Sequence, residues 1–127
     1  MQDNRLFEYA VIRVVPRVDR EEFLNVGVIL YSRDHKFLQA IYTIDEKRLQ
    51  AFSHELDIEL VKNHICAFEK ICAADVDGGP IALLDMASRF RWLTATRSTI
   101  VQTSKVHPGL TKDPQKTLIK LHNELVL

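Results

Sequence analysis

The sequence predicts an α+β fold, in which helices pack on one face of a mostly antiparallel sheet of four strands. Two observations point to this class. From Leu6 to Ile44 the apolar residues follow strand-like patterns, whereas from Ile58 to Leu93 they recur at helical steps of three and four. The predicted order is strand, strand, strand, helix, helix, helix, strand, helix, and such segregation is typical of α+β proteins.

The length and composition predict a single domain over residues 1–127. With 46% hydrophobic and 27% charged residues, the chain can bury a core without staples. Seventeen basic and seventeen acidic residues give a net charge of zero, so the general attraction to nucleic acids and membrane surfaces is absent. Because neither a signal peptide nor a membrane-spanning run is recognisable, we expect a soluble, cytoplasmic protein.

Three strands are predicted in the N-terminal part of the chain. The first, Leu6 to Val15, is rich in β-branched residues and ends at Pro16, which cannot donate to a sheet. The second, Asn25 to Tyr31, is apolar on both faces, with Val26, Val28 and Leu30 expected on one side. Gly27 within it indicates either a bulge or the close approach of another backbone or a ligand. A polar turn leads to the third strand, Phe37 to Ile44.

Aspartate and proline mark the predicted helix starts. Asp45 is the expected N-cap of a short helix, and Asp57 that of a longer one reaching about Ala74. Gly79-Pro80 begins a third helix that ends near Leu93, and Asp113-Pro114 begins the last one. Between them we expect a fourth strand at 98–103, followed by a loop at 104–112.

Two polar features stand out within the apolar strands. Arg13 places a guanidinium in the middle of the first strand, where it needs an exposed edge or an anion. Glu21 and Glu22 are adjacent, so in an extended chain they point to opposite faces and cannot act as a paired acid and base. We expect one of them to form a structural salt bridge with Arg13 or Arg97.

Motifs for cofactors and metals are absent. The glycines do not form a dinucleotide or phosphate-binding pattern, and the five histidines lack ligand spacing. Cys66 and Cys72 are six residues apart in a predicted helix, which fits neither a metal pair nor a redox pair, so both are expected to be reduced thiols. No cofactor and no metal site are therefore predicted.

Four blocks carry a resemblance to a known family. They are Tyr9-Ala-Val-Ile-Arg13 with Pro16, Glu22-Phe-Leu-Asn-Val-Gly-Val-Ile-Leu30, Phe90-Arg-Trp-Leu93 with Arg97-Ser-Thr99 and Gln102, and Val106-His-Pro-Gly-Leu110. Together they resemble an uncharacterised bacterial family, the domain of unknown function three-zero-three-seven, over nearly the whole chain. Its genes often lie beside genes for proteins similar to HipA-like kinases, which implies such a kinase as a partner. The polar residues that match its signature positions are Arg13, Glu22, Asn25, Arg97, Ser98 and His107.

We therefore expect a binding or regulatory module, in which these six residues either hold the fold or receive a partner segment or a small anion. One alternative is an enzyme acting on a phosphate ester or nucleotide, with Arg13 and Arg97 as an anion clamp and Glu22 or His107 as general base. A second is nucleic-acid binding, which zero net charge disfavours, through Arg89, Arg91, Trp92, Arg97 and Lys105. An exposed sheet edge would also permit a homodimer.

Overall fold

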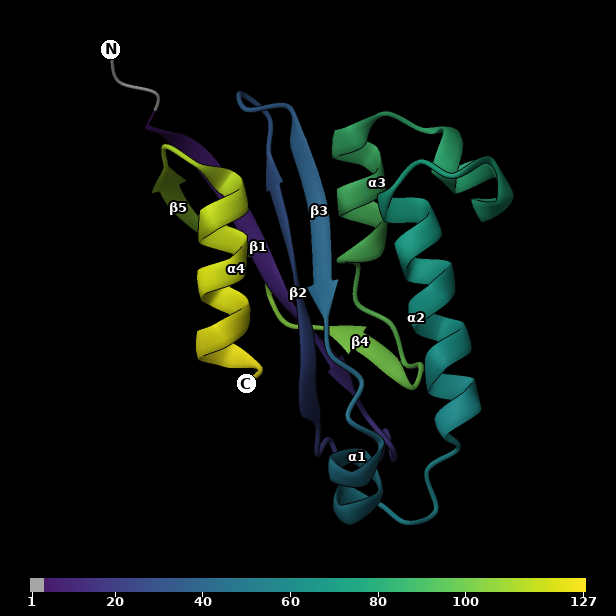
Figure 1. Cartoon of the computed structure of the whole chain (residues 1–127). Helices are drawn as coiled ribbons and strands as arrows, with labels where there is room; N and C mark the ends of the chain where they lie inside the picture. Colours follow the sequence, from purple (N-terminus) through teal and green to yellow (C-terminus); the bar gives the residue numbers. More distant parts are fainter. Residues whose placement is uncertain (1–3) are drawn as a thin grey trace.

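The computed structural model describes residues 4–127 and shows a twisted sheet between two helical layers (Figure 1). The strands are β1 (Arg5–Val14), β2 (Leu24–Ser32), β3 (Phe37–Tyr42), β4 (Val101–Thr103) and β5 (His107–Thr111). The helices are α1 (Glu46–Phe52), α2 (Ile58–Cys72), α3 (Met86–Leu93) and α4 (Pro114–Leu125). The α+β class predicted from the sequence is confirmed.

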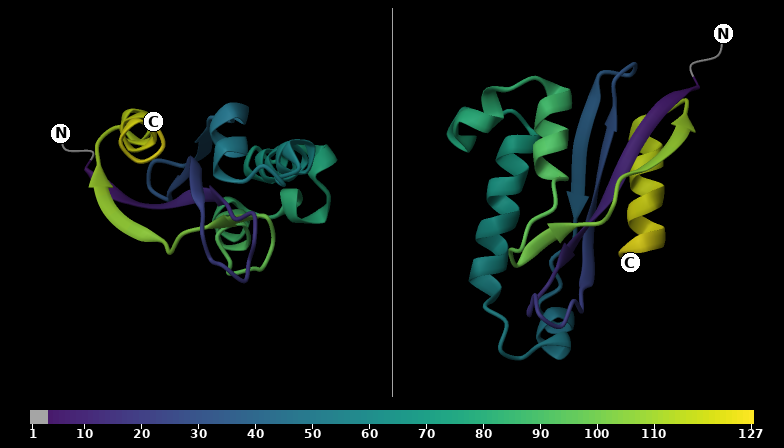
Figure 2. Two further views of the ribbon diagram at one scale, coloured as in Figure 1. Left: turned by 90° about the horizontal axis from the view of Figure 1, so that it is seen from below. Right: turned by 180° about the vertical axis from the view of Figure 1, so that it is seen from behind.

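Strand β1 is the one on which most pairing converges. The sheet runs in the order β3-β2-β1-β4, and β5 pairs with β1 as well, always antiparallel. Strands β4 and β5 pair with different parts of the same edge of β1: β4 pairs with residues 12–14 and β5 with residues 5–9 (Figure 2, right). The sheet thus has five strands where four were expected.

The additional strand β5 lies within the segment 104–112 that was expected to be a loop. Its His107-Pro-Gly109 sequence is typical of a turn, but proline is tolerated in a strand at the sheet edge. Gly109 pairs with Phe7, and a Cβ at this glycine would lie 2.6 Å from the Phe7 ring. Proline and glycine, which usually indicate a turn, therefore belong here to a short outer strand, and Gly109 allows it to pack closely against Phe7.

The helices cover both faces of the sheet, whereas one covered face was expected. On one face α4 packs over Phe7, Val28 and Leu30 (Figure 1). On the other, α2 and α3 pack over a larger core that includes Ile12 and Ile29. The reason is that β2 carries fully buried apolar side chains on both of its faces, and each face needs a cover.

The predicted third helix is interrupted. A 3₁₀ turn occupies Val76–Gly78 and another Pro80–Leu83, and α3 starts only at Met86. The Asp85 side chain accepts a hydrogen bond from the backbone amide of Ser88, which makes Asp85 the N-cap of a separate helix. Asp45, Asp57 and Asp113 cap their helices in the same way, as predicted.

Gly27 lies next to a β-bulge and also close to the backbone of another strand, so both interpretations of this glycine from the sequence apply. Ile12 pairs with Gly27 and Arg13 with Asn25, so Val26 is the extra residue of a β-bulge. The bulge places Val26 in the core under α2, while Val28 faces α4, which differs from the expected alternation. Strand β3 also approaches closely, because a Cβ on Gly27 would lie 2.6 Å from the carbonyl oxygen of Ile41.

We predict that Gly27→Ala lowers the free energy of unfolding by about 1–3 kcal/mol, because the added methyl group must displace the backbone of β3. Urea denaturation followed by circular dichroism measures this change. Gln39→Ala on the exposed side of β3 is the control and should change the free energy by less than about 0.5 kcal/mol. Equal stability of Gly27→Ala and the unmodified protein would contradict the close approach.

The C-terminal end of α4 is attached to the sheet and to α1 by polar contacts. His122 Nε2 lies 2.8 Å from Thr43 Oγ1, and Asn25 Nδ2 donates to the Leu125 carbonyl oxygen at 3.1 Å. Arg48 on α1 donates to the Val126 carbonyl oxygen at 2.8 Å. His122 is only 6% exposed, and its burial lowers the pKa of the imidazole below its usual value.

This shift predicts that stability falls on acidification. Between the unfolded pKa of about 6.5 and the lower folded pKa, the unfolded chain binds more protons than the folded one, so the unfolding free energy decreases as the pH falls through this window. Above it, the contribution of His122 is fully present. We expect His122→Gln to flatten the dependence of the unfolding free energy on pH in urea titrations between about pH 5 and 7, whereas Gln39→Ala, which changes no titratable group, should leave that dependence unchanged.

Candidate functional site

The six polar residues predicted from the sequence do not form one cluster. Arg13 and Asn25 are directly paired on β1 and β2. His107 lies on β5 opposite Tyr9, and the two rings are 5.3 Å apart between centroids. The remaining three lie in connecting segments: Glu22 between β1 and β2, and Arg97 and Ser98 between α3 and β4.

Glu22 forms its salt bridge with Arg20, which corrects the expected pairing with Arg13 or Arg97. Arg20 donates to the two carboxylate oxygens of Glu22 over 2.6 and 3.1 Å, and this hydrogen bonding lowers the pKa of the Glu22 carboxyl. The connection turns sharply because Glu21 has a φ of 57°, in the left-handed region. This turn brings the side chains at positions 20 and 22 together, and the sequence offers no sign of it.

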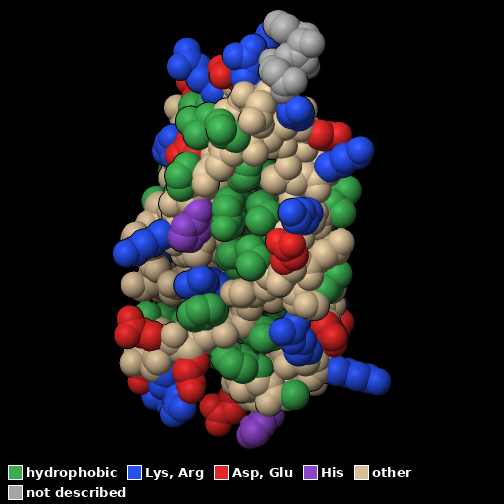
Figure 3. All heavy atoms as spheres, turned by 90° about the vertical axis from the view of Figure 1, so that its left-hand side faces the viewer, with side chains coloured by type: hydrophobic (Ala, Val, Ile, Leu, Met, Phe, Trp, Pro, Cys, Tyr) green, Lys and Arg blue, Asp and Glu red, His purple; other side chains and the backbone are tan. Residues whose placement is uncertain are grey.

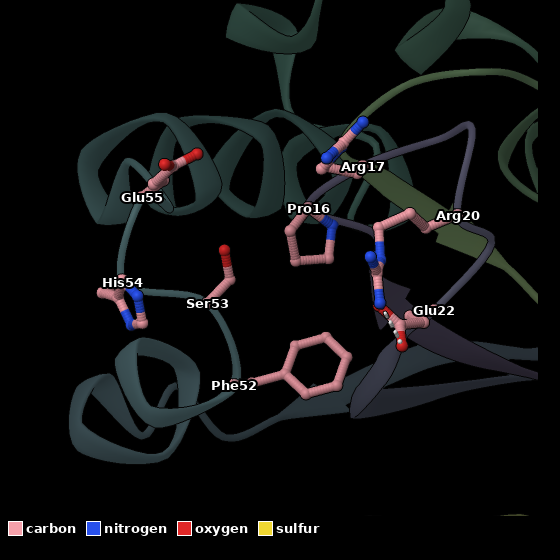
Figure 4. Close-up of a pocket in the computed structure, with 8 residues that line it drawn as sticks. All are labelled: Pro16, Arg17, Arg20, Glu22, Phe52, Ser53, His54 and Glu55. Atoms are coloured by element: carbon pink, nitrogen blue, oxygen red, sulfur yellow. Dashed lines mark hydrogen bonds and ion pairs between the residues drawn. The ribbon is translucent and has the colours of Figure 1, made fainter.

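The Glu22 carboxylate lines a cavity of about 360 Å³ between the β1–β2 connection and the loop after α1 (Figure 4). The close-up shows Phe52 and Pro16 facing the cavity, with Arg20 joined to Glu22 at its edge. Arg17 on the same rim pairs with Asp19 at 2.7 Å. Since both arginines are neutralised by neighbouring carboxylates, this cavity has little net attraction for a charged ligand.

Arg13 occupies a different electrostatic environment. Its guanidinium carbon lies 3.7 Å from the centroid of the Phe23 ring, a cation–π geometry that fixes the side chain. Burial lowers the pKa of Arg13, although the group remains a cation, and Nε is buried without a hydrogen-bond partner among the described residues. Within residues 4–127, no carboxylate forms a salt bridge with Arg13.

Asn25 provides an unpaired acceptor beside this unpaired donor. Its amide nitrogen is used by the Leu125 carbonyl, but Oδ1 is buried and has no partner in the described part of the chain. The bulge at Val26 is what turns Asn25 toward α4 and places it opposite Arg13. Arg13 and Asn25 thus each keep one buried polar atom without a partner among the described residues, and we take this pair as the candidate site.

An apolar strip accompanies the pair on this side of the molecule. Figure 3 shows hydrophobic side chains running down the face that carries α4 and β5, flanked by basic and acidic groups. On α4 and the neighbouring strand, Tyr9, Leu121 and Leu125 are only partly buried, and Phe23 is 43% exposed. Such a surface suits contact with another protein better than it suits a small polar substrate.

The basic residues of the nucleic-acid alternative are largely engaged inside the protein. Arg89 is buried and donates to the carbonyl oxygens of Leu84, Ile71 and Cys72, the last two in the final turn of α2. Arg91 forms a two-pronged salt bridge with Glu8. Two of the five residues are thus structural, and Arg89 completes the C-terminal end of α2.

We predict that Arg89→Met lowers the free energy of unfolding by about 2–4 kcal/mol, because the buried carbonyl groups of Ile71 and Cys72 and the partly buried one of Leu84 lose a charged donor. Arg91→Met is the matched control on the same helix, and loss of its exposed salt bridge should cost less than about 1 kcal/mol. Urea denaturation of both variants makes the comparison. Similar losses for the two would contradict a structural role specific to Arg89.

Other kinds of site find little support in the geometry. Among residues 4–127, no three histidine, cysteine or acidic side chains gather closely enough to hold a metal ion. Cys66 is exposed and Cys72 buried, neither forms a disulfide, and burial raises the pKa of Cys72 to about 12. In this described range, none of the helices is long and apolar enough to cross a membrane.

Sequence reasoning missed the two aromatic partners of the arginines. The guanidinium carbon of Arg13 lies 3.7 Å from the Phe23 ring centroid, and that of Arg97 lies 4.3 Å from the Trp92 ring centroid, whereas from the sequence Trp92 was considered for a nucleic-acid surface. The signal available was an aromatic residue in a connector of charged residues, at 17–24, where no helix or strand stripe accounts for it.

The fold and the site define a small α+β protein in which Arg13 and Asn25 each keep one polar atom without a partner within residues 4–127. The chain belongs to the family described as Protein of unknown function (DUF3037), whose model matches residues 9–126. This confirms the family identified from the four sequence blocks. Neither the curated proteins nor the solved structures include a match to the chain.

Proposed function

We propose that this protein is a binding module, which receives an anionic group of a partner protein at Arg13. The observation that carries the proposal is the guanidinium of Arg13, half-buried against Phe23 and without a carboxylate partner in the described chain. A partly desolvated cation costs free energy unless an anion compensates it. A carboxylate or phosphate of a partner would supply this compensation.

The fixed position of Arg13 favours binding further. Stacking on Phe23 holds the planar guanidinium before any ligand arrives, so less conformational entropy is lost on association. The apolar strip beside it adds surface that a protein segment can bury. The family resemblance implies a HipA-like kinase as the partner.

The binding role is favoured over the enzyme alternative by the separation of the proposed catalytic groups. An enzyme of the expected kind needs Arg13, Arg97 and a base in one cleft. Glu22 lines the cavity of Figure 4 and is held by Arg20, whereas Arg97 lines a second cavity on α2. His107 packs against Tyr9 on the outer strand.

The proposal predicts that Arg13→Gln weakens a complex with a HipA-like kinase, the partner that the family resemblance implies, by at least tenfold, because the partner's anion loses a charge-assisted hydrogen bond. Co-expression followed by gel filtration and calorimetry measures the complex. The matched control is Arg17→Gln, which removes an exposed arginine already neutralised by Asp19. Equal affinity for both variants, or a homodimer in place of the complex, would overturn the proposal.

A second measurement tests the anion site without the partner. The Nε–H resonance of Arg13 should shift on addition of sodium phosphate or sodium succinate, and sodium chloride at equal ionic strength should leave it unchanged. Arg13→Lys keeps the charge but has no Nε–H group, so the signal that disappears in this variant is assigned to Arg13. Absence of any shift would count against an anion at Arg13, and the complex measurement then decides whether the apolar strip alone binds the kinase.

A further inference from the structure

A second cavity, of about 240 Å³, lies between α2, the end of α3 and β4. Its walls are apolar, since Phe68 and Ile71 of α2, Leu93 of α3 and Val101 of β4 all line it. These residues belong to or pack against the core under α2 and α3, whereas Asn25 contacts α4. The cavity is therefore separate from the site proposed above and independent of that function.

Among the described residues that line this cavity, Arg97 carries the one fixed charge. Arg97 and His64 are both lining residues, as is Thr99, and the described lining includes no carboxylate. Thr99 donates its hydroxyl to the Val101 carbonyl oxygen at 2.7 Å and is thereby satisfied within the chain. The guanidinium of Arg97 is thus the group at this cavity best suited to attract an anion.

Arg97 is held in place rather than free in solvent. Its guanidinium carbon lies 4.3 Å from the Trp92 ring centroid, and one of its nitrogens donates to the Trp92 carbonyl oxygen. No salt bridge within residues 4–127 engages it, so its remaining donors are available to a carboxylate. Trp92 is 40% exposed and also lines the cavity.

We propose that this cavity binds a small amphipathic carboxylate, with its apolar part against Phe68, Ile71 and Val101 and its carboxylate on Arg97. An apolar space with one fixed cation discriminates by charge at the polar end and by size within. One water molecule occupies about 30 Å³ of liquid, so the cavity of about 240 Å³ has the volume of roughly eight water molecules. A medium-chain fatty acid or a single-ring aromatic acid has the fitting size.

Tryptophan fluorescence provides the test, because Trp92 is the single tryptophan of the chain. The full-length protein is titrated with sodium octanoate below its micelle-forming range, and in parallel with 1-octanol and octylamine. We expect a saturable change in emission with octanoate, binding at least tenfold weaker with 1-octanol, and no response to octylamine. Equal affinity for octanoate and 1-octanol, or no saturable response to octanoate, would overturn the proposal.

Two variants separate the cation from the cavity. Arg97→Gln should bring the affinity for octanoate down to that for 1-octanol, whereas Arg91→Gln, which removes the neighbouring arginine paired with Glu8, should keep the tenfold difference. Ala67→Phe leaves Arg97 intact but fills part of the space, and should weaken octanoate and 1-octanol alike. Octanoate binding that survives both Arg97→Gln and Ala67→Phe would overturn the site.

Amide resonances locate the ligand independently of the emission of Trp92. Octanoate should shift signals of residues 64–71 and 97–101 and leave those of Phe23 and Asn25 unchanged. Shifts confined to Arg13 and Asn25 would overturn this inference and would instead support an anion at the site proposed above. The two proposals can therefore fail separately.

Discussion

The burial of β2 on both faces is the constraint that organises this structure. Val28 and Leu30 are fully buried toward α4, and Ile29 is fully buried toward α2 and α3. A strand of this kind requires a cover on each side, so the chain builds two helical layers around an antiparallel sheet. The bulge at Val26 ends this regular alternation and turns Asn25 toward α4, which creates the polar pair with Arg13.

Much of the fold was predictable, because local sequence patterns determine it. Strand-like runs, helical stripes and the capping aspartates Asp45, Asp57 and Asp113 each act over a few residues. The strand β5 was not predictable, since His107-Pro-Gly109 indicates a turn unless Phe7 is known to lie across from it. The second helical layer follows from the burial pattern of β2, but which helix forms it is a tertiary property.

The sequence predicted that Arg13 needs a partner, but it did not predict the geometry of the candidate site. A guanidinium within an apolar strand indicates that Arg13 needs an anion. In the structure, Arg13 Nε is buried and has no hydrogen-bond partner within residues 4–127. Glu22 does not pair with Arg13, because the left-handed backbone conformation of Glu21 brings Glu22 to Arg20. A glutamate rarely adopts this conformation, so the sequence does not indicate it. Phe23 lies in a connecting segment, where the sequence carries no periodic signal, and Trp92 lies in the last turn of α3, so the stacking of the two arginines on them is a tertiary property.

The position of α4 in the chain order has a consequence for biosynthesis. It is the last described element, yet it alone covers Phe7, Val28 and Leu30 on one side of the sheet. During translation, β2 and β3 are synthesised before α4. Until α4 packs, their apolar surface is exposed to chaperones and proteases. A chain interrupted before Pro114 keeps that surface open, which marks incomplete molecules for removal while finished ones conceal it.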